Sequence, residues 1–206
     1  MDNPANSTMT DADDIDEGLY SRQLYVLGHD AMRAMAKSSV LVLGCDGLAL
    51  EIAKNIILAG LRSVSIYDPA PATMSDLSSN FYLSESHISG KTPRAHACID
   101  KLASLNPYVS VSVFDQPINL AEPDPSVLAA FAVVVMVNQP FAAQRAVDAI
   151  CHKSDIKFIS VSARGVFGSI FCDFGPSFTV TDATGEQPKT VLVSAITKES
   201  PPLSPV

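Results

Sequence analysis

The fold is decided by the stretch Val40-Leu41-Val42-Leu43-Gly44-Cys45-Asp46-Gly47-Leu48-Ala49. Its first four residues are all apolar, which is typical of a short strand buried on both of its faces. The strand ends at a glycine, and residues 47–59 then place apolar side chains at the 3.6-residue spacing of an amphipathic helix. The stretch therefore predicts a strand, a tight turn and a helix, which together make half of a βαβ unit.

The same alternation of strand and helix continues on both sides of this stretch. The residues that predict strands are 40–43, 63–67, 109–114, 132–137 and 157–161. The residues that predict helices are 20–27, 30–36, 47–59, 95–105 and 141–152, and the segments 69–79 and 116–125 have the composition of irregular structure. Apolar strands that alternate with amphipathic helices favour an α/β fold, a doubly wound, Rossmann-like parallel sheet with helices on both sides.

The pattern changes near residue 165. The segments 166–174, 178–181 and 190–197 are rich in β-forming residues, and no helical pattern separates them. They predict the start of a small antiparallel β unit, which the Pro-rich residues after it cannot extend because proline has no N–H for a strand ladder. The predicted organisation is a disordered acidic leader, an α/β domain, an incomplete β unit and a Pro-rich tail, at 1–14, 15–165, 166–199 and 200–206.

The charge is concentrated at one end of the chain. The formal net charge of the 206 residues is −8, and six of the acidic residues lie within the first 17 positions. The remainder is nearly balanced, so the acidity indicates a solvated leader, and without a basic cluster no nucleic-acid partner is expected. The longest apolar run, 127–137, has 11 residues. Since about 20 are needed to span a bilayer, no membrane partner is expected either.

The four cysteines, Cys45, Cys98, Cys151 and Cys172, have no C-x-x-C spacing and no cysteine–histidine ligand pattern, so they predict no metal site. The first 18 residues are polar and acidic, unlike a secretory signal peptide. We therefore expect reduced thiols in a protein of the cytoplasm or the nucleus. Cys151 and His152 are neighbours on a predicted helix, where their side chains point apart, so they make a poor nucleophile–base pair.

The turn that contains Gly44 and Gly47 has two interpretations. A glycine turn between a strand and a helix can hold a phosphate group on backbone N–H groups and the helix N-terminus. The spacing here is G-x-x-G-x-A, however, and Asp46 adds a negative charge while it can also cap the helix. These features favour a tight turn without a nucleotide. For Asp68, which ends the next predicted strand, a ribose-binding role and a turn-forming role before Pro69 are both open.

Four further runs carry a resemblance to a known family. They are Asp16-Glu17-Gly18-Leu19-Tyr20-Ser21-Arg22-Gln23-Leu24-Tyr25-Val26-Leu27-Gly28, Glu51-Ile52-Ala53-Lys54-Asn55-Ile56-Ile57-Leu58-Ala59-Gly60, Asp76-Leu77-Ser78-Ser79-Asn80-Phe81-Tyr82-Leu83 and Phe171-Cys172-Asp173-Phe174-Gly175, and Thr181-Asp182 and Gly185-Glu186-Gln187-Pro188 continue the last of them. The first run resembles the opening of ubiquitin-activating enzymes, which belong to the ThiF/MoeB-like family, and the next two resemble the helix and the segment that follow it. The last run resembles the entry to their first catalytic-cysteine half-domain. The resemblance covers about residues 15–199. It implies that 15–165 is a ThiF-type adenylation half and that 166–199 begins the first catalytic-cysteine half-domain.

The resemblance also implies that this is the inactive half of a two-half enzyme. The turn lacks the third glycine, and Ser79-Asn80-Phe81 stands where an active half has Arg-Gln-Phe. Asn138 stands where an active half has an aspartate that helps to hold magnesium, and an amide is not the anionic ligand that this cation prefers. We expect Mg-ATP as the cofactor of the intact enzyme and none for the isolated chain. Cys172 does not match the thioester cysteine, so no catalytic residue is expected here.

Two basic residues match positions that contact nucleotide in the family. Arg22 matches an arginine that touches the ATP phosphates of the companion half, a contact that suits a guanidinium. From the residues alone, an ion pair with a nearby acid on a solvated helix is favoured; the resemblance shifts the preference to the phosphate role. Lys91 matches a nucleotide-binding lysine of active halves, but a solvated lysine is the preferred interpretation. Gly44, Gly47, Asp68 and Lys91 are thus expected to be vestigial.

The expected function is that of the non-catalytic half of a ubiquitin-activating enzyme. It would support ATP-dependent adenylation and thioester activation of ubiquitin, or of a ubiquitin-like modifier, by an active adenylation half as its partner. One alternative is a truncated pseudo-enzyme that acts as a binding module. A second alternative is an NAD(P)-linked oxidoreductase, which has the fold but neither the full glycine fingerprint nor a hydride-transfer site.

Overall fold

The computed structural model describes residues 17–180, which contain one six-stranded sheet. Its strands are β1 Ser39–Leu43, β2 Ser63–Tyr67, β3 Ser110–Val113, β4 Val133–Val137, β5 Lys157–Arg164 and β6 Phe167–Asp173. The order across the sheet is β3-β2-β1-β4-β5-β6, and the first five strands are parallel. The chain runs from β1 outward through β2 to β3 and then returns to β4 on the other side of β1, so the sheet is doubly wound, as the sequence predicts.

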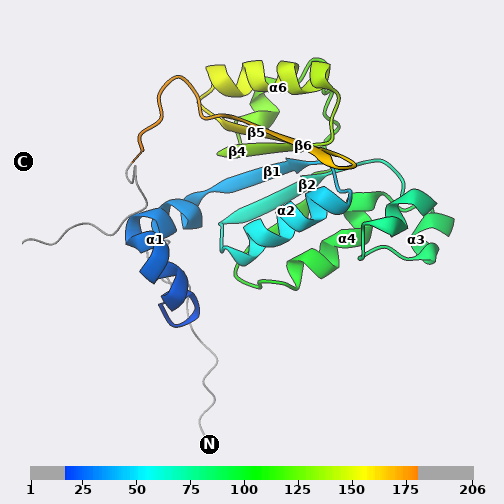
Figure 1. The fold of residues 1–206 in the computed structure, drawn as a ribbon, viewed down its shortest axis with the longest axis horizontal. Coiled ribbons are helices and arrows are strands. Elements are labelled where there is room, and N and C mark those ends of the chain that lie inside the picture. The colour runs from blue at the N-terminus through cyan, green and yellow to red at the C-terminus, as the bar shows by residue number, and fades with distance from the viewer. Residues whose placement is uncertain (1–16, 181–206) are drawn as a thin grey trace, which may run out of the picture.

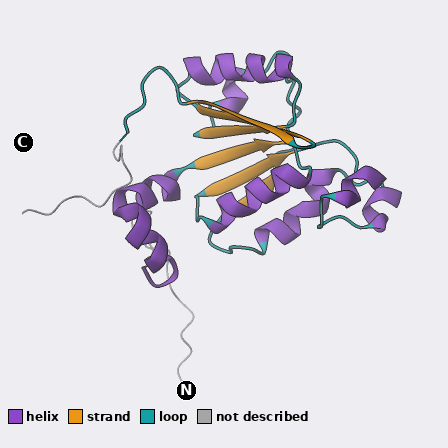
Figure 2. Cartoon of the chain, in the orientation of Figure 1, coloured by secondary structure: helices purple, strands orange, loops and turns teal. Residues whose placement is uncertain are grey.

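The helices lie on both faces of this sheet (Figure 1; Figure 2). The longer ones are α1 Glu17–Lys37, α2 Gly47–Leu58, α4 Arg94–Ala103 and α6 Phe141–Lys153, and the shorter ones are η1 Met74–Ser78, α3 Glu85–Ser89 and α5 Pro125–Leu128. Helices α2 and α4 cover one face, while α6 covers the other. Gly28 has φ 79° and ψ 165°, so α1 is two helices joined at a kink, which confirms the predicted separation.

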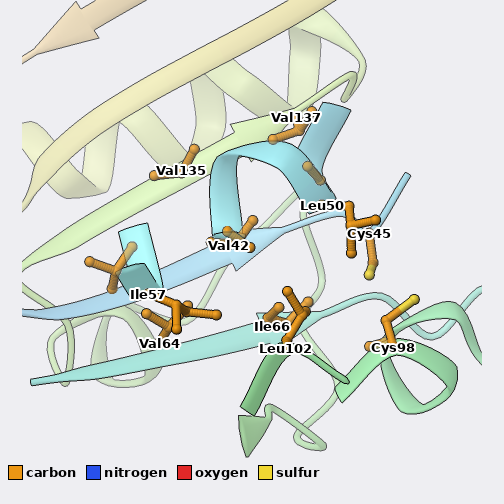
Figure 3. Close-up of a cluster of buried hydrophobic side chains, with 14 of the residues drawn as sticks. Val42, Cys45, Leu50, Ile57, Val64, Ile66, Cys98, Leu102, Val135 and Val137 are labelled. Carbon is orange, nitrogen blue, oxygen red and sulfur yellow. The ribbon is translucent and has the colours of Figure 1, made fainter. Parts of the chain in front are cut away.

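The core consists of two apolar clusters, one on each face of the sheet. Alternate residues of β1 serve both, since Val40 and Val42 point toward α2 and α4 whereas Leu41 and Leu43 point toward α5 and α6. Figure 3 shows the first cluster, in which side chains of α2 and α4 meet those of β1, β2 and β4. Burial of β1 on both faces explains why its sequence is continuously apolar.

Three short helices escaped the sequence prediction. Helix η1 lies in the segment predicted to be irregular, α5 begins at the end of the predicted loop 116–125, and α3 lies in a part of the chain left unassigned. Local hydrogen bonds hold their first turns, such as those of Asp76 with the Thr73 N–H and hydroxyl. An element of four or five residues is too short to show a hydrophobic period, so only its capping residues could have predicted it.

Strand β6 confirms the expected change to antiparallel structure after residue 165, but it is placed differently. It pairs with β5 along its whole length and becomes the edge strand of the same sheet. The structure thus joins residues 167–173 to the preceding domain, whereas the sequence analysis assigned them to the following unit. A β pattern shows that a segment pairs and not which strand it pairs with. The domain boundaries themselves stay a prediction.

The predicted leader 1–14, the β segment 190–197 and the tail 200–206 lie outside the described residues. Among the residues described, no helix combines the length and the apolar character needed to cross a membrane.

Candidate functional site

The candidate site is the turn between β1 and α2. It lies at the carboxyl ends of the parallel strands, where β1 lies between β2 and β4. The connection after β1 leads to one side of it, and the later strands β4 and β5 lie on the other side. Open α/β sheets bind ligands at such a switch point. A pocket of about 270 Å³ opens beside the turn. Its lining residues are Leu43, Gly44, Tyr67, Asp68, Pro69, Ala70, Arg94, Ile118, Leu120 and Gln139.

Both glycines of the turn are required by its geometry. Gly44 has φ +116°, a backbone conformation that favours glycine, and a Cβ there would lie 3.1 Å from the Val137 carbonyl oxygen. A Cβ on Gly47 would lie 2.6 Å from the Ser79 Cβ and 2.8 Å from the Ser79 carbonyl oxygen. Ser79 therefore packs directly on the turn. A tight turn in contact with a neighbouring segment accounts for both glycines.

Asp46 caps helix α2, as the sequence predicts. Its Oδ1 accepts a hydrogen bond of 2.9 Å from the Ala49 N–H. Its Oδ2 accepts a 2.7 Å hydrogen bond from the Asn138 amide at the end of β4. The Asn138 Oδ1 in turn accepts from the Ala163 N–H at 2.9 Å. The amide at the position expected for a magnesium ligand thus connects the turn to β5.

Asp68 is bonded to the turn and to Arg94. Its Oδ2 accepts hydrogen bonds from the Cys45 N–H at 2.7 Å and from Arg94 Nε at 2.9 Å. Its Oδ1 accepts from Arg94 Nη2 at 3.2 Å and from the Ala70 N–H at 3.1 Å. The carboxylate is 5% exposed, and the guanidinium binds it in two places. Asp68 therefore stabilises the protein's own turn with both of its oxygens, and no oxygen is left without a partner.

Arg94 also binds a second carboxylate. Its Nη1 donates to Asp76 Oδ1 at 3.1 Å, while Thr73 donates to Asp76 Oδ2. Burial raises the pKa of the Asp76 carboxyl, but the hydrogen bonds from Thr73 and Arg94 outweigh it, so this pKa lies below its usual value. Burial lowers the pKa of the Arg94 guanidinium, and the pairing with Asp68 and Asp76 raises it further than burial lowers it. The Arg94 guanidinium is thus shared between two acids.

These residues do not fit Mg-ATP. The carboxylates of Asp68 and Asp76 face one guanidinium, and Asp46 adds a third negative charge in the turn, so a triphosphate would meet net negative charge. The pocket of about 270 Å³ is below the roughly 300–1,000 Å³ that is usual for ligand sites. Within residues 17–180, no group of three or more His, Cys, Asp or Glu side chains is placed to hold a metal ion. No chemical step through a nucleotide at this turn follows from its geometry.

The sequence model of the ThiF family matches residues 20–197. The chain belongs to the ThiF family. It is 47% identical over 199 residues to "Ubiquitin-activating enzyme E1 1" of Schizosaccharomyces pombe, covering 97% of this chain and 19% of that protein. It is 50% identical over 188 residues to "Ubiquitin-like modifier-activating enzyme 1" of Homo sapiens, covering 91% of this chain and 17% of that protein. The chain therefore spans less than a fifth of the length of these relatives.

The sheet and its helices also resemble those of solved ThiF-fold structures. The crystal structure of E. coli MccB with succinimide superposes with a TM-score of 0.63 at 16% sequence identity, over 77% of this chain and 49% of that one. At this identity the likeness concerns the fold alone.

The two basic residues singled out in this ThiF-family chain lie away from the turn. Arg22 is on the first part of α1, where it is exposed and has no ion-pair partner among the described residues. Lys91 is exposed, has φ 51° and is not among the residues that line the pocket. The structure thus brings together Gly44, Gly47 and Asp68, whereas Arg22 and Lys91 stand apart from them.

The first part of α1 is nevertheless held in a fixed orientation. The Gln23 side chain donates a 2.9 Å hydrogen bond to the Ala59 carbonyl oxygen, just after α2. The Tyr20 hydroxyl accepts a 3.0 Å bond from the Asn106 amide, and Tyr20 packs on Gly60, where a Cβ would lie 2.6–2.8 Å from the Tyr20 hydroxyl and ring atoms. Two contacts therefore fix one side of the helix, and Arg22 projects from another.

Sequence reasoning missed Arg94, Asp76 and the structural role of Asn80. Arg94 begins α4, and a cation is unfavourable at a helix N-terminus unless acids compensate it, which is a signal that could have identified it. Asn80 is fully buried, and its amide donates to the Cys45 carbonyl oxygen at 3.1 Å. In the run Ser79-Asn80-Phe81, which stands where an active half has Arg-Gln-Phe, the Asn80 side chain thus holds the turn.

The thiols follow the sequence prediction. All four cysteines are free, and Cys45, Cys98 and Cys151 are buried while Cys172 is exposed on β6. Cys151 belongs to the core cluster under α6, whereas His152 is exposed and lies 2.9 Å from Asp173 Oδ2. The two side chains point apart, as expected of neighbours on a helix.

Proposed function

We propose that this chain is the non-catalytic half of a ubiquitin-activating enzyme and that it supports adenylation by a companion half without holding Mg-ATP itself. The observation that carries the proposal is the closed turn. The Cys45 N–H, which could face a nucleotide, donates to the Asp68 carboxylate, and the same carboxylate accepts from Arg94. The relatives that are 47–50% identical are ubiquitin-activating or ubiquitin-like modifier-activating enzymes, which supports the pathway. Ubiquitin or a ubiquitin-like modifier is the proposed substrate.

The energetics of the turn support a non-catalytic role. To bind a phosphate in the usual way, the turn would have to release the Cys45 N–H from Asp68, and Arg94 would have to leave at least one of its acids. Breaking a buried ion pair costs about 3–5 kcal/mol. A millimolar ligand supplies only about 4 kcal/mol of binding free energy, so opening the turn would consume most of it.

In this proposal, Arg22 contacts the phosphates of the ATP that the companion half binds. This guanidinium is exposed on a helix whose other side is fixed by Tyr20 and Gln23, so little conformational freedom of the backbone would be lost when it binds. A free guanidinium can bind two phosphate oxygens at once.

Exposed apolar side chains support an interface with the companion half. Tyr25 on α1 is 83% exposed and Ile170 on β6 is 73% exposed. Other large apolar side chains on these two elements are also exposed, namely Val26, Leu27, Phe167 and Phe171. Groups of exposed apolar residues usually mark contact surfaces. A partner that covers α1 would also bring its own nucleotide within reach of Arg22.

The first experiment measures Mg-ATP binding to the 206-residue chain by isothermal titration calorimetry. We expect no saturable binding up to about 1 mM, since the turn is closed by its own hydrogen bonds. Tight magnesium-dependent binding with turnover to AMP would overturn the proposal.

The second experiment places Arg22→Ala in the complete enzyme, with this chain and the companion half together. Loss of a charged hydrogen bond of about 1.5–3 kcal/mol should slow ATP–pyrophosphate exchange by about tenfold or more. Arg33→Ala is the matched control, because Arg33 is also exposed on α1 but pairs with Asp30 at 3.3 Å. It should change the rate less than about twofold. An equal effect of the two substitutions would remove the role of Arg22.

A binding module is the second candidate, and the same exposed side chains favour it. The chain would then bind its partner through α1 and β6 without contributing to adenylation. Capture of a protein that carries an active adenylation half, with exchange activity restored in the mixture, supports the non-catalytic half. Stable capture of such a protein with no effect of Arg22→Ala on exchange supports the module.

A further inference from the structure

Two thiols that the proposed function does not use meet beside the closed turn. Cys45 follows Gly44 at the end of β1, and Cys98 lies one turn into α4. Both are almost fully buried, at 1% and 0% exposed. Figure 3 shows their sulfur atoms pointing toward one another across the gap between β1 and α4. The two thiols lie close enough to shift each other's pKa, so a small movement of either side chain can bring the sulfurs to bonding distance.

The surroundings make the two sulfurs unequal. The neighbouring Cys45 thiol lowers the pKa of the Cys98 thiol, helped by the Asn80 amide and by the charge of Lys101, against the effects of burial and of Asp68. The Asn80 Nδ2 lies 3.4 Å from Cys98 Sγ. The neighbouring Cys98 thiol, together with burial, raises the pKa of Cys45. Cys98 is therefore the nucleophile of the pair, and Cys45 is a protonated neighbour.

We infer that Cys45 and Cys98 form a modification site at which a hydroperoxide converts two thiols into a disulfide. The Cys98 thiolate attacks one peroxide oxygen, the O–O bond breaks, and a sulfenic acid forms while hydroxide leaves and takes up a proton. The Cys45 sulfur then attacks the sulfenic sulfur, so the S–S bond forms and the S–O bond breaks. The Cys45 proton leaves with this hydroxide as a second water. Two electrons pass from the sulfurs to the peroxide.

Burial determines the class of oxidant. The site is closed by Asn80, which is itself fully buried, so a bulky charged disulfide such as oxidised glutathione is excluded from it. Hydrogen peroxide is small and neutral, and local opening of the chain is enough to admit it. The other two cysteines are not alternatives for the partner sulfur. Cys151 lies in the cluster on the opposite face of the sheet, with its pKa raised to about 12 by burial, and Cys172 is exposed on β6.

The new bond would join the two elements that already meet at the Asp68–Arg94 pair. Cys45 donates its N–H to Asp68, and Arg94 begins the helix that carries Cys98. A covalent link between turn and helix would therefore lock the closed arrangement. This inference concerns only residues of this chain, and it stands whether or not the chain supports adenylation.

The test uses the 206-residue chain with Cys172→Ser, which removes the exposed thiol. The reduced, folded protein is treated with hydrogen peroxide, alkylated with N-ethylmaleimide and digested with trypsin. Trypsin releases Cys45 in peptide 38–54 and Cys98 in peptide 95–101. We expect a cross-linked product of these two peptides, a loss of about 2 Da from the intact chain and recovery of both thiols with dithiothreitol.

The matched control adds Cys98→Ala, with folding checked by circular dichroism. Links that involve Cys45 should then form at least about tenfold more slowly, since the nearby nucleophile is gone. A second comparison replaces peroxide by oxidised glutathione, which should give no cross-link in the folded chain. The inference is overturned if the cross-link appears only in urea, if Cys45 links equally fast in the control, or if both thiols stay free while the chain is folded.

Discussion

The turn after β1 and the outer side of α1 use their charged residues in opposite ways. At the turn, Asp68, Arg94 and Asp76 are bonded to one another and to the backbone. On α1, Arg22 is exposed without an ion-pair partner among the described residues, while Tyr20 and Gln23 fix the helix beside it. The charges at the turn stabilise the fold, whereas Arg22 on α1 leaves a charge available to bind a partner. The difference indicates where binding to a partner can occur.

The largest effect on this difference between the two regions is expected from Asp68→Ala, which removes a charge that stabilises the turn. The substitution leaves the Cys45 N–H unpaired and Arg94, whose side chain is 24% exposed, with one acid instead of two. Breaking such a buried pair should lower the free energy of unfolding by about 3–5 kcal/mol, measured by urea denaturation at pH 7. The control is Glu51→Ala, which removes an exposed pair with Lys54 and should cost less than about 1 kcal/mol. Equal losses would show that the turn does not depend on Asp68.

Gly47→Ala tests the close packing of the turn. The new methyl group would lie 2.6–2.8 Å from Ser79 atoms, including its backbone oxygen, so the segment has to shift. We expect a loss of about 1–3 kcal/mol in the free energy of unfolding. Gly168→Ala on β6 is the matched control, because its Cβ would meet only the Ser162 oxygen at an ordinary 3.6 Å. A control as damaging as Gly47→Ala would contradict the assignment.

Asp76→Asn sharpens the role of the second acid. Its carboxyl pKa is depressed in the folded chain, so the stability that it contributes is present above the unfolded pKa, near 3.8, and is lost as pH falls through the folded pKa. The variant should be about 1 kcal/mol less stable at pH 7. The difference in the free energy of unfolding between the variant and the wild type, measured by urea titration, should disappear below about pH 4. A gap that stays constant down to pH 2.5 would exclude the charge as its cause.

The smallest expected effect is a gain in stability, and it comes from a substitution on α6. Asp148 has an oxygen that is buried without a hydrogen-bond partner among the described residues, and burial together with Asp173 raises its pKa. A raised pKa stabilises the fold below the unfolded value and loses that stability as pH rises through the folded value. Asp148→Asn should therefore raise the free energy of unfolding by about 0.5 kcal/mol at pH 7 and leave it unchanged near pH 3, as measured by urea titration. A loss at pH 7 would refute this.

Much of the fold could be predicted because its signals are local. The apolar run of β1, the glycine at the kink of α1 and the Asp46 cap all act within a few residues of their own positions. The short helix η1 and the placement of β6 could not be predicted in the same way. Helix η1 is held by the local carboxylate of Asp76, and it is too short to show a hydrophobic period. The placement of β6 depends on which edge of the folded sheet has a strand left to pair with.

The candidate site divides in the same manner. Gly44, Gly47 and Asp68 were found because their positions relative to a strand are fixed by the βαβ pattern. Arg94 was missed since its acids lie 18 and 26 residues away in the sequence, and Asn80 was missed because its burial arises from packing against Cys45 and Cys98. The same packing brings together two thiols that are far apart in the chain.

By itself, the sequence determined the order of strands and helices, the turn with its capping acid, and a resemblance that the family match confirms. Only the tertiary structure decided that the turn is closed, that Arg22 is turned outward and that Cys45 faces Cys98. The physical reason is the range of the interactions. Helix periods, caps and glycine turns act between near neighbours, whereas ion pairs and thiol contacts join residues that only the folded sheet brings within a few ångströms.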